Sequence, residues 1–178
     1  MAIETERLIL REIDPERDFE PWARAMADEN TVRYLGVKPM TRAEAWRSMA
    51  LVIGHWSIRG FGFFSLEHRD TGAWTGRVGP WFPQGWPAPE VGWTIAPEFV
   101  GQGYATEAAR AAVDHVFGSL GWPQVVHVIM EGNAPSIAVA GKIGSTLIRA
   151  QQGLPGITDH KVLIYGQAAD GGPARLPD

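Results

Sequence analysis

The stretch from residue 90 to residue 130 constrains the fold most, because a strand, a glycine pair, a helix and a second strand follow one another in it. Residues 90–95 read as a strand, and Gly101 and Gly103 come just before an amphipathic helix over residues 104–117. Residues 125–130 are almost continuously apolar, which is typical of a central strand covered on both faces. If the two strands are parallel neighbours, the helices that follow them both begin at one edge of the sheet.

The remaining segments predict further strands and helices around this unit. Asp14 predicts the start of one helix, the capping box at residues 41–44 predicts another, and Asn133 begins a shorter one. Residues 1–167 are expected to form a single domain, and the Gly/Pro-rich residues 168–178 a flexible C-terminal tail. The expected strands cover residues 7–11, 61–68, 73–82, 90–95, 125–130, 146–150 and 161–166.

The composition excludes several classes of protein. The chain has 178 residues, which suits one domain, and its 45% hydrophobic and 20% charged residues are typical of a globular protein. It has no cysteine, which excludes disulfides, a thiolate nucleophile and an iron–sulfur cluster, and its 5 histidines show no metal-ligand spacing. The net charge of -4 argues against nucleic-acid binding, and no apolar stretch approaches the ~18 residues of a membrane span. We expect a cytoplasmic protein that binds no metal, nucleic acid or membrane.

Gly101 and Gly103 stand where the backbone can come close to a ligand. Free N–H groups at the start of the following helix, together with its dipole, form a cradle suited to a pyrophosphate. The alternative, slightly favoured by the glycines alone, is that they only turn the chain. A dinucleotide-binding Rossmann loop fits poorly, because Thr106 replaces its third glycine and other residues separate the strand from the loop. Asn133 and Ser136 place a polar pair beside whatever the first loop holds.

Four short sequence patterns, which include the glycine loop and the Asn133–Ser136 pair, follow one another along the chain. They are T-E-R-L-I-L-R at residues 5–11, E-V-G-W at residues 90–93, G-Q-G-Y-A-T-E-A at residues 101–108, and N-A-P-S at residues 133–136 followed by K-I-G. In this order and spacing they resemble the GNAT superfamily of acetyl-CoA-dependent N-acetyltransferases, in the branch of the ribosomal-protein N-terminal acetyltransferases. The resemblance covers nearly the whole chain, from about residue 3 to residue 167.

The resemblance implies a fold class and a cofactor. The fold is α/β of the α+β type, a mixed, strongly bent sheet of about seven strands with about four helices. The sheet is splayed between the fourth strand, residues 90–95, and the fifth, residues 125–130. Acetyl-CoA is the acetyl donor, with its pantetheine arm in the splay and its pyrophosphate on the glycine loop. The implied cofactor-binding residues are Trp93, Thr94, Ile95, Gly101, Gln102, Gly103, Tyr104, Ala105, Thr106, Asn133, Ser136 and Lys142.

Glu90, Ser136 and Asn133 are the candidate catalytic residues under this resemblance. Glu90 would act as a general base, directly or through water, and the equally supported alternative is a structural carboxylate at a strand end. Nearby tryptophans would exclude water from Glu90 and raise its pKa. Ser136 would protonate the leaving thiolate, because Ala140 stands where many relatives have a tyrosine. Asn133 would reach the pantetheine beside it. For Lys142, a solvated lysine at a helix end is the more common alternative to a phosphate contact.

Trp81, Trp86 and Asp159 are the candidate residues on the acceptor side. Aromatic faces attract cations, so the two tryptophans would form a wall for an amine, and packing in the core is the alternative. Asp159 precedes the last strand, where a simple turn residue is the alternative. Glu107 is expected to complement the helix dipole, and Ser145, which replaces the usual phenylalanine, only to weaken local packing.

Two functions follow from these residues. The first is an enzyme that moves an acetyl group from acetyl-CoA to a primary amine by direct attack in a ternary complex. The amine belongs either to a protein N-terminus or to a small molecule, and a homodimer is common among relatives. The second is a non-catalytic acyl-CoA-binding or sensor module on the same fold. Turnover with any amine distinguishes the two.

Overall fold

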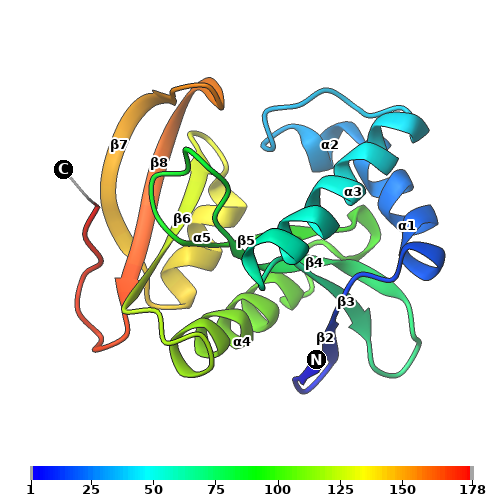
Figure 1. The fold of residues 1–178 in the computed structure, drawn as a ribbon, viewed down its shortest axis with the longest axis horizontal. Coiled ribbons are helices and arrows are strands. Elements are labelled where there is room, and N and C mark those ends of the chain that lie inside the picture. The colour runs from blue at the N-terminus through cyan, green and yellow to red at the C-terminus, as the bar shows by residue number, and fades with distance from the viewer. Residues whose placement is uncertain (1, 177–178) are drawn as a thin grey trace.

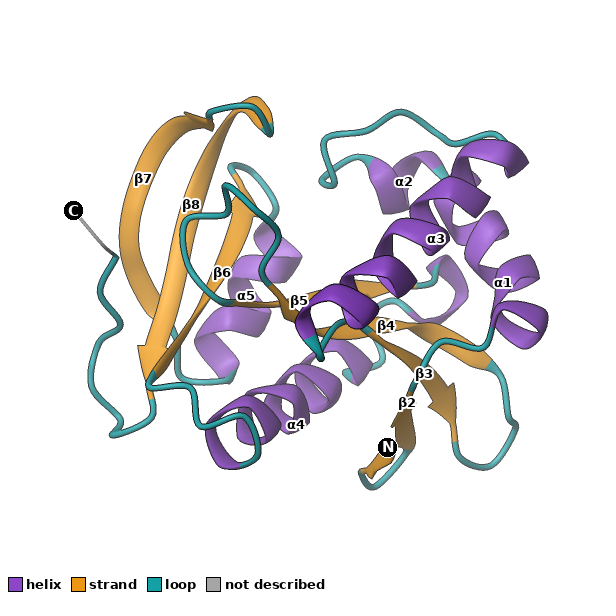
Figure 2. Cartoon of the chain, viewed as in Figure 1, coloured by secondary structure: helices purple, strands orange, loops and turns teal. Residues whose placement is uncertain are grey.

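The fold places strands β2 to β5 between two groups of helices. The computed structural model describes residues 2–176, and these form an eight-stranded sheet in the order β1-β2-β3-β4-β5-β6-β8-β7. Figures 1 and 2 show α1 to α3 on one side of β2–β5 and α4 on the other. The elements are β1 (Ala2–Glu4), β2 (Leu8–Arg11), α1 (Pro15–Ala27), α2 (Glu29–Val32), α3 (Arg42–Arg59), β3 (Phe64–His68), β4 (Trp74–Trp81), β5 (Glu90–Ile95), a 3-10 turn (Pro97–Phe99), α4 (Tyr104–Gly118), β6 (Gln124–Met130), α5 (Ala134–Lys142), β7 (Thr146–Leu154) and β8 (Thr158–Ala168).

The mixed sheet predicted from the sequence is confirmed, with two additions. Strand β1 is three residues long and pairs with β2, and α2 is a four-residue turn capped by the Asp28 side chain. The resemblance implied about seven strands, and the described residues form eight. Both additions are too short to show a periodic pattern in the sequence. The described residues also form five α-helices where about four were expected.

The helix starts follow the capping signals. The Asp14 side chain accepts hydrogen bonds from the backbone N–H groups of Glu16 and Arg17 at the start of α1. Thr41 and Glu44 form the predicted capping box of α3. These helices bury one apolar cluster against the sheet, and α4 buries a second one against strands β2 to β5 and β6. Each face of the sheet therefore has its own core.

Residues 169–176, part of the expected flexible tail, lie against the sheet. The Arg175 N–H donates to Gln124 Oε1 at 2.8 Å, and Gln124 Nε2 donates to the Arg175 carbonyl at 2.6 Å. Ala174 is buried. The last residues of the chain, 177 and 178, lie outside the described part.

The sheet opens between β5 and β6. These two strands run parallel and share a single register pair, Glu90 with Val126. Every other neighbouring pair of strands is antiparallel and shares three or more register pairs. Figure 1 shows β6, β8 and β7 turning away from β2–β5 beyond this point. The splay implied by the resemblance is therefore present, and it positions the candidate site.

No helix among residues 2–176 is both long and apolar enough to cross a lipid bilayer.

Candidate active site

The ladder between β5 and β6 stops because two side chains replace its next rung. After the pair of Glu90 with Val126, a continuing parallel ladder would join the Val128 N–H to the Val91 carbonyl. The Val128 N–H donates instead to Glu90 Oε1 at 3.0 Å. The Val91 carbonyl accepts from His127 Nδ1 at 2.7 Å. Glu90 and His127 thus satisfy the two backbone groups of the first hydrogen bond that the opening removes.

His127 is held in one protonation state by its partners. A carbonyl only accepts, so Nδ1 carries the proton toward Val91, and Nε2 accepts from Ser145 Oγ at 2.9 Å. Gln167 Nε2 donates to Ser145 Oγ at 3.0 Å, which extends the network to β8. Burial lowers the pKa of His127 to about 4, so the ring is neutral. Ser145, expected only to weaken packing, is a buried link in this network.

Glu90 is buried at the start of β5, with 6% of its surface exposed. Its Oε2 accepts from Trp86 Nε1, and its Oε1 from the Val128 N–H. Burial raises the pKa of Glu90 to about 7, against the smaller opposing effect of these two hydrogen bonds. No ion pair within residues 2–176 includes Glu90. A carboxyl group with a pKa near neutral, held in a fixed position, can take a proton at physiological pH.

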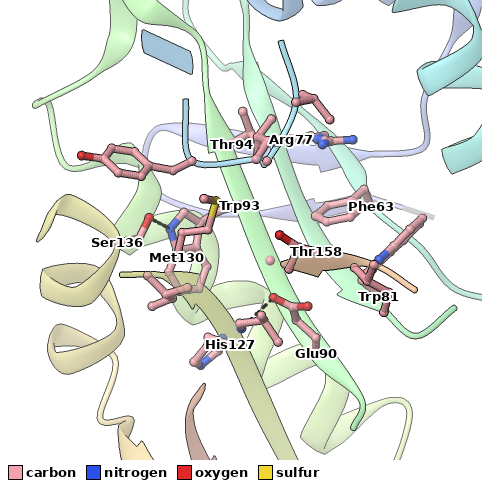
Figure 3. Close-up of a pocket in the computed structure, with 18 of the residues that line it drawn as sticks. Phe63, Arg77, Trp81, Glu90, Trp93, Thr94, His127, Met130, Ser136 and Thr158 are labelled. Carbon is pink, nitrogen blue, oxygen red and sulfur yellow. Dashed lines mark hydrogen bonds between the residues drawn. The ribbon is translucent and has the colours of Figure 1, made fainter. Parts of the chain in front are cut away.

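A cavity of about 360 Å³ joins the two sides of the splay. Figure 3 shows Ser136 and Trp93 on one side of it, Phe63 and Trp81 on the opposite side, and Glu90 between them. A volume of this size suits part of a small ligand. The predicted site residues that line the cavity are Trp81, Trp86, Glu90, Trp93, Thr94, Asn133 and Ser136.

Asn133 and Ser136 belong to the start of α5. Asn133 Oδ1 accepts from the Ser136 N–H at 3.2 Å and caps the helix, so this oxygen is already used. Trp93 Nε1 donates to Ser136 Oγ at 3.3 Å. The serine oxygen therefore acts as acceptor toward Trp93 and keeps its own O–H free to donate.

Lys142 and Asp159 lie apart from this cavity. Lys142 is exposed at the end of α5, and its carbonyl accepts from Arg110. Asp159 is exposed near the start of β8, and only its neighbours Ile157 and Thr158 line the cavity. The structure thus brings together the other acceptor-side and thioester-side candidates but not these two.

The glycine loop presents free main-chain donors. Gly101 and Gly103 have positive φ angles of 83° and 85°, and Gly103 is the N-cap residue of α4. The N–H groups of residues 101–105 have no hydrogen-bond acceptor within residues 2–176. The Thr106 N–H donates to the Gly103 carbonyl at 3.1 Å, so it is less free than the resemblance implied. Five free donors at a helix start fit the pyrophosphate of acetyl-CoA.

Glu107 holds the glycine loop to the beginning of the chain. It accepts from Thr5 Oγ1 at 2.6 Å, from the Arg7 N–H at 2.8 Å and from Arg7 Nε at 2.7 Å. Arg7 Nη1 also donates to the Gln102 carbonyl at 3.0 Å, and its guanidinium lies over the Tyr104 ring. Two of the sequence patterns, residues 5–11 and 101–108, therefore form one structural unit.

Comparison with known proteins agrees with this geometry. Residues 7–146 match the family described as Acetyltransferase (GNAT) domain, so the chain belongs to the GNAT family of N-acetyltransferases. It is 30% identical over 145 residues to the uncharacterized N-acetyltransferase YoaA of Bacillus subtilis, covering 80% of this chain and 81% of that protein. An acetyltransferase from Agrobacterium tumefaciens has a TM-score of 0.80 at 29% identity, with 93% of each chain covered.

A ribosomal-protein acetyltransferase, RimL, was solved with coenzyme A and has the same fold. Its TM-score is 0.77 at 20% identity, covering 96% of this chain and 99% of that one. Proteins of this fold and family use acetyl-CoA. Within residues 2–176, no three or more Asp, Glu, His or Cys side chains form a group that could hold a metal ion.

Replacing Gly103 with valine tests the glycine loop. A side chain there would stand where the pyrophosphate approaches the backbone, and its Cβ would meet only the flexible end of Arg7, at 3.4 Å. We expect the Kd for acetyl-CoA to rise about tenfold or more, measured by calorimetry. Gly121→Val is the matched control, because Gly121 also has a positive φ and open space but lies beyond the other end of α4. Equal affinities in the two variants would contradict the assignment.

Replacing His127 with phenylalanine tests the side-chain hydrogen bonds that take the place of the β5–β6 backbone hydrogen bond. The change leaves the Val91 carbonyl without its donor and the Ser145 O–H without its acceptor, so the free energy of unfolding near neutral pH should fall by about 1–3 kcal/mol. The unfolded chain protonates His127 near pH 6.5 and the folded chain near pH 4. The wild type therefore loses the stability due to His127 as the pH falls from about 6.5 to about 4. The variant has no histidine at this position and does not lose stability in this way.

Chemical denaturation at about pH 7.5 and about pH 5 measures the difference. The gap between wild type and His127→Phe should narrow at the lower pH. His160→Phe is the control, because His160 is exposed, and it should show no such narrowing. A constant gap would mean that His127 is not held neutral by its surroundings.

Proposed function

We propose that this protein acetylates a primary amine by direct attack of the amine on acetyl-CoA in a ternary complex. The observation that carries the proposal is the single cavity in which Glu90, Ser136 and the opened edge of β5 meet. The cavity reaches the thioester side at Ser136 and an aromatic side at Trp81. Holding both reactants side by side supplies much of the rate acceleration.

Glu90 is the proposed base. An ammonium group must lose a proton before its nitrogen can attack, and a carboxylate with a pKa near 7 accepts that proton, directly or through one water. Trp86 and the Val128 N–H fix the carboxylate in the wall of the cavity. The same contacts support a structural role, and the rate measurements below separate the two roles.

The thioester carbonyl and the leaving sulfur need separate donors. Backbone groups of alternate residues in a strand face the same side, so the Trp93 N–H faces the opening as the Val91 carbonyl does. We assign this N–H to the developing oxyanion. Ser136 donates its free O–H to the thiolate that departs, and Trp93 Nε1 keeps the serine oxygen oriented. The proton from the ammonium stays on Glu90 until solvent removes it. The second proton, which the nitrogen loses as the amide forms, passes through the Ser136 hydroxyl to the departing thiolate.

A screen of primary amines for coenzyme A release tests the proposal as a whole. Peptides with free N-termini, polyamines, amino acids and amino sugars cover the candidate acceptors. Turnover with any of them supports the enzyme. Acetyl-CoA binding without turnover across the full screen would favour the acyl-CoA-binding module instead.

Glu90→Gln keeps the shape of the side chain and removes the base. The rate near neutral pH should fall by about 10²–10⁴-fold. The wild-type rate should rise through a pKa near 7 that is absent in the variant, and the variant should recover partly at high pH, where free amine is abundant. The affinity for acetyl-CoA should change little. A variant with the wild-type pH–rate profile would make Glu90 a structural residue of the splay.

Ser136→Ala tests the leaving-group contact. A hydrogen bond to the departing thiolate strengthens in the transition state, so turnover should fall more than acetyl-CoA affinity. Steady-state kinetics and calorimetry on the same preparation give both numbers. If the turnover rate and the affinity for acetyl-CoA fall in proportion, Ser136 is a binding residue only.

A further inference from the structure

Arg77 occupies an unusual position for an arginine. It lies in β4 opposite Thr94, half-buried, and lines the cavity on the acceptor side. Its guanidinium carbon is 4.7 Å from the centroid of the Trp22 ring and 4.8 Å from that of Phe63. Figure 3 shows Arg77 beside Thr94, above the Phe63 ring. Aromatic rings therefore cover much of a cation that faces a cavity.

Among residues 2–176 this cation has no acidic partner. Its side-chain hydrogen bond is the long one from Nε to Thr94 Oγ1, at 3.5 Å. Burial lowers its pKa to about 10. A poorly solvated charge without a partner is costly, and a bound anion would offset that cost.

Arg11, at the end of β2, shows what a structural arginine looks like in this chain. Its guanidinium donates to both oxygens of Asp18, at 2.8 and 2.7 Å, and to Glu67 at 2.7 Å. Asp18 is buried and adds a hydrogen bond from Ser65. Arg77 differs in that it lines the cavity and forms no ion pair with an acid among residues 2–176.

We propose that Arg77 binds a carboxylate of the acceptor, so that the substrate is a small molecule with both a primary amine and a carboxylate. This inference rests on the acetyl transfer proposed above. Arginine presents a planar fork of N–H donors that pairs with both oxygens of a carboxylate. The phosphates of acetyl-CoA belong to the glycine loop, and residues 101–106 take no part in lining this cavity.

The strand register adds a constraint on the distance between the two groups. Arg77 pairs with Thr94, whereas Trp81 pairs with Glu90, four residues away along both strands. Four residues span about 13 Å of strand. The amine near Glu90 and the carboxylate at Arg77 are therefore separated by several bonds, as in an ω-amino acid.

Matched substrate pairs test the inference. The probes are a series of ω-amino acids of increasing length, each compared with the alkylamine of the same length that lacks the carboxylate. In the wild-type enzyme the amino acid of the preferred length should have the lower KM. In Arg77→Gln its KM should rise roughly 10- to 100-fold, while the KM for the matched alkylamine changes little. Arg77→Lys keeps the charge, loses the fork and should be intermediate.

Arg47→Gln is the matched control, because Arg47 is exposed on α3 and does not line this cavity. It should behave as the wild type does with every probe. A wild type that does not distinguish the paired substrates would overturn the inference, as would equal losses for both in Arg77→Gln. An Arg77→Gln variant with weakened acetyl-CoA binding would place Arg77 on the donor and overturn it as well.

Binding measurements separate this inference from the proposed reaction. Calorimetry with the ω-amino acids is carried out on protein saturated with coenzyme A. Binding that is present in the wild type and lost in Arg77→Gln supports the carboxylate site even where no acetyl transfer occurs. Absence of binding in the wild type, for every length, would overturn it. Unchanged acetyl-CoA affinity and circular dichroism show that the variant is folded.

Discussion

The site depends on one exchange between β5 and β6, in which two side-chain hydrogen bonds replace one backbone hydrogen bond. Opening a sheet between neighbouring strands normally leaves an N–H on one strand and a carbonyl on the other without partners, and each is costly when buried. Here the Glu90 carboxylate takes the N–H of Val128, and the His127 ring takes the carbonyl of Val91. The first backbone hydrogen bond lost at the opening is therefore replaced on both strands by a side-chain partner.

The two side chains at this opening are both uncharged over a shared range of pH. Burial keeps His127 neutral above about pH 4 and favours the protonated form of Glu90 below about pH 7. The stability that His127 contributes is lost as the pH falls from about 6.5 to about 4, and that of Glu90 is lost as the pH rises from about 4.5 to about 7. Deprotonation of Glu90, which the proposed reaction needs, therefore works against the packing of the splay. Trp86 and the Val128 N–H limit this conflict, because both donate to the carboxylate.

Local signals in the sequence predicted much of this architecture. The cap at Asp14 and the capping box at Thr41 marked the starts of α1 and α3, and β5 covers the predicted residues 90–95. The polar contacts across the sheet could not be predicted in this way, since His127, Ser145 and Gln167 meet only after β6, β7 and β8 have paired. No local pattern distinguishes such residues from isolated polar side chains.

The same limit applies to the site residues. Glu90, Ser136 and the two tryptophans of the acceptor side share one cavity because β4, β5 and α5 follow the expected topology. Asp159 was placed from its sequence neighbours, and a one-position difference along β8 leaves Thr158 at the cavity and Asp159 exposed. The unpaired state of Arg77 depends on which acids fold near it, which only the three-dimensional arrangement determines.

The contact of Glu107 with Thr5 and Arg7, between β1 and β2, has a consequence for protein engineering. The glycine loop looks like a portable motif, since its donors are backbone groups and its two glycines are separated by a single residue. Its position, however, depends on Thr5 and Arg7, about 100 residues earlier in the chain. A loop transplanted with α4 alone would keep every glycine and lose the support that fixes its carbonyl at Gln102. The transferable module is the pair of segments together, and a chimaera must take both from the same parent.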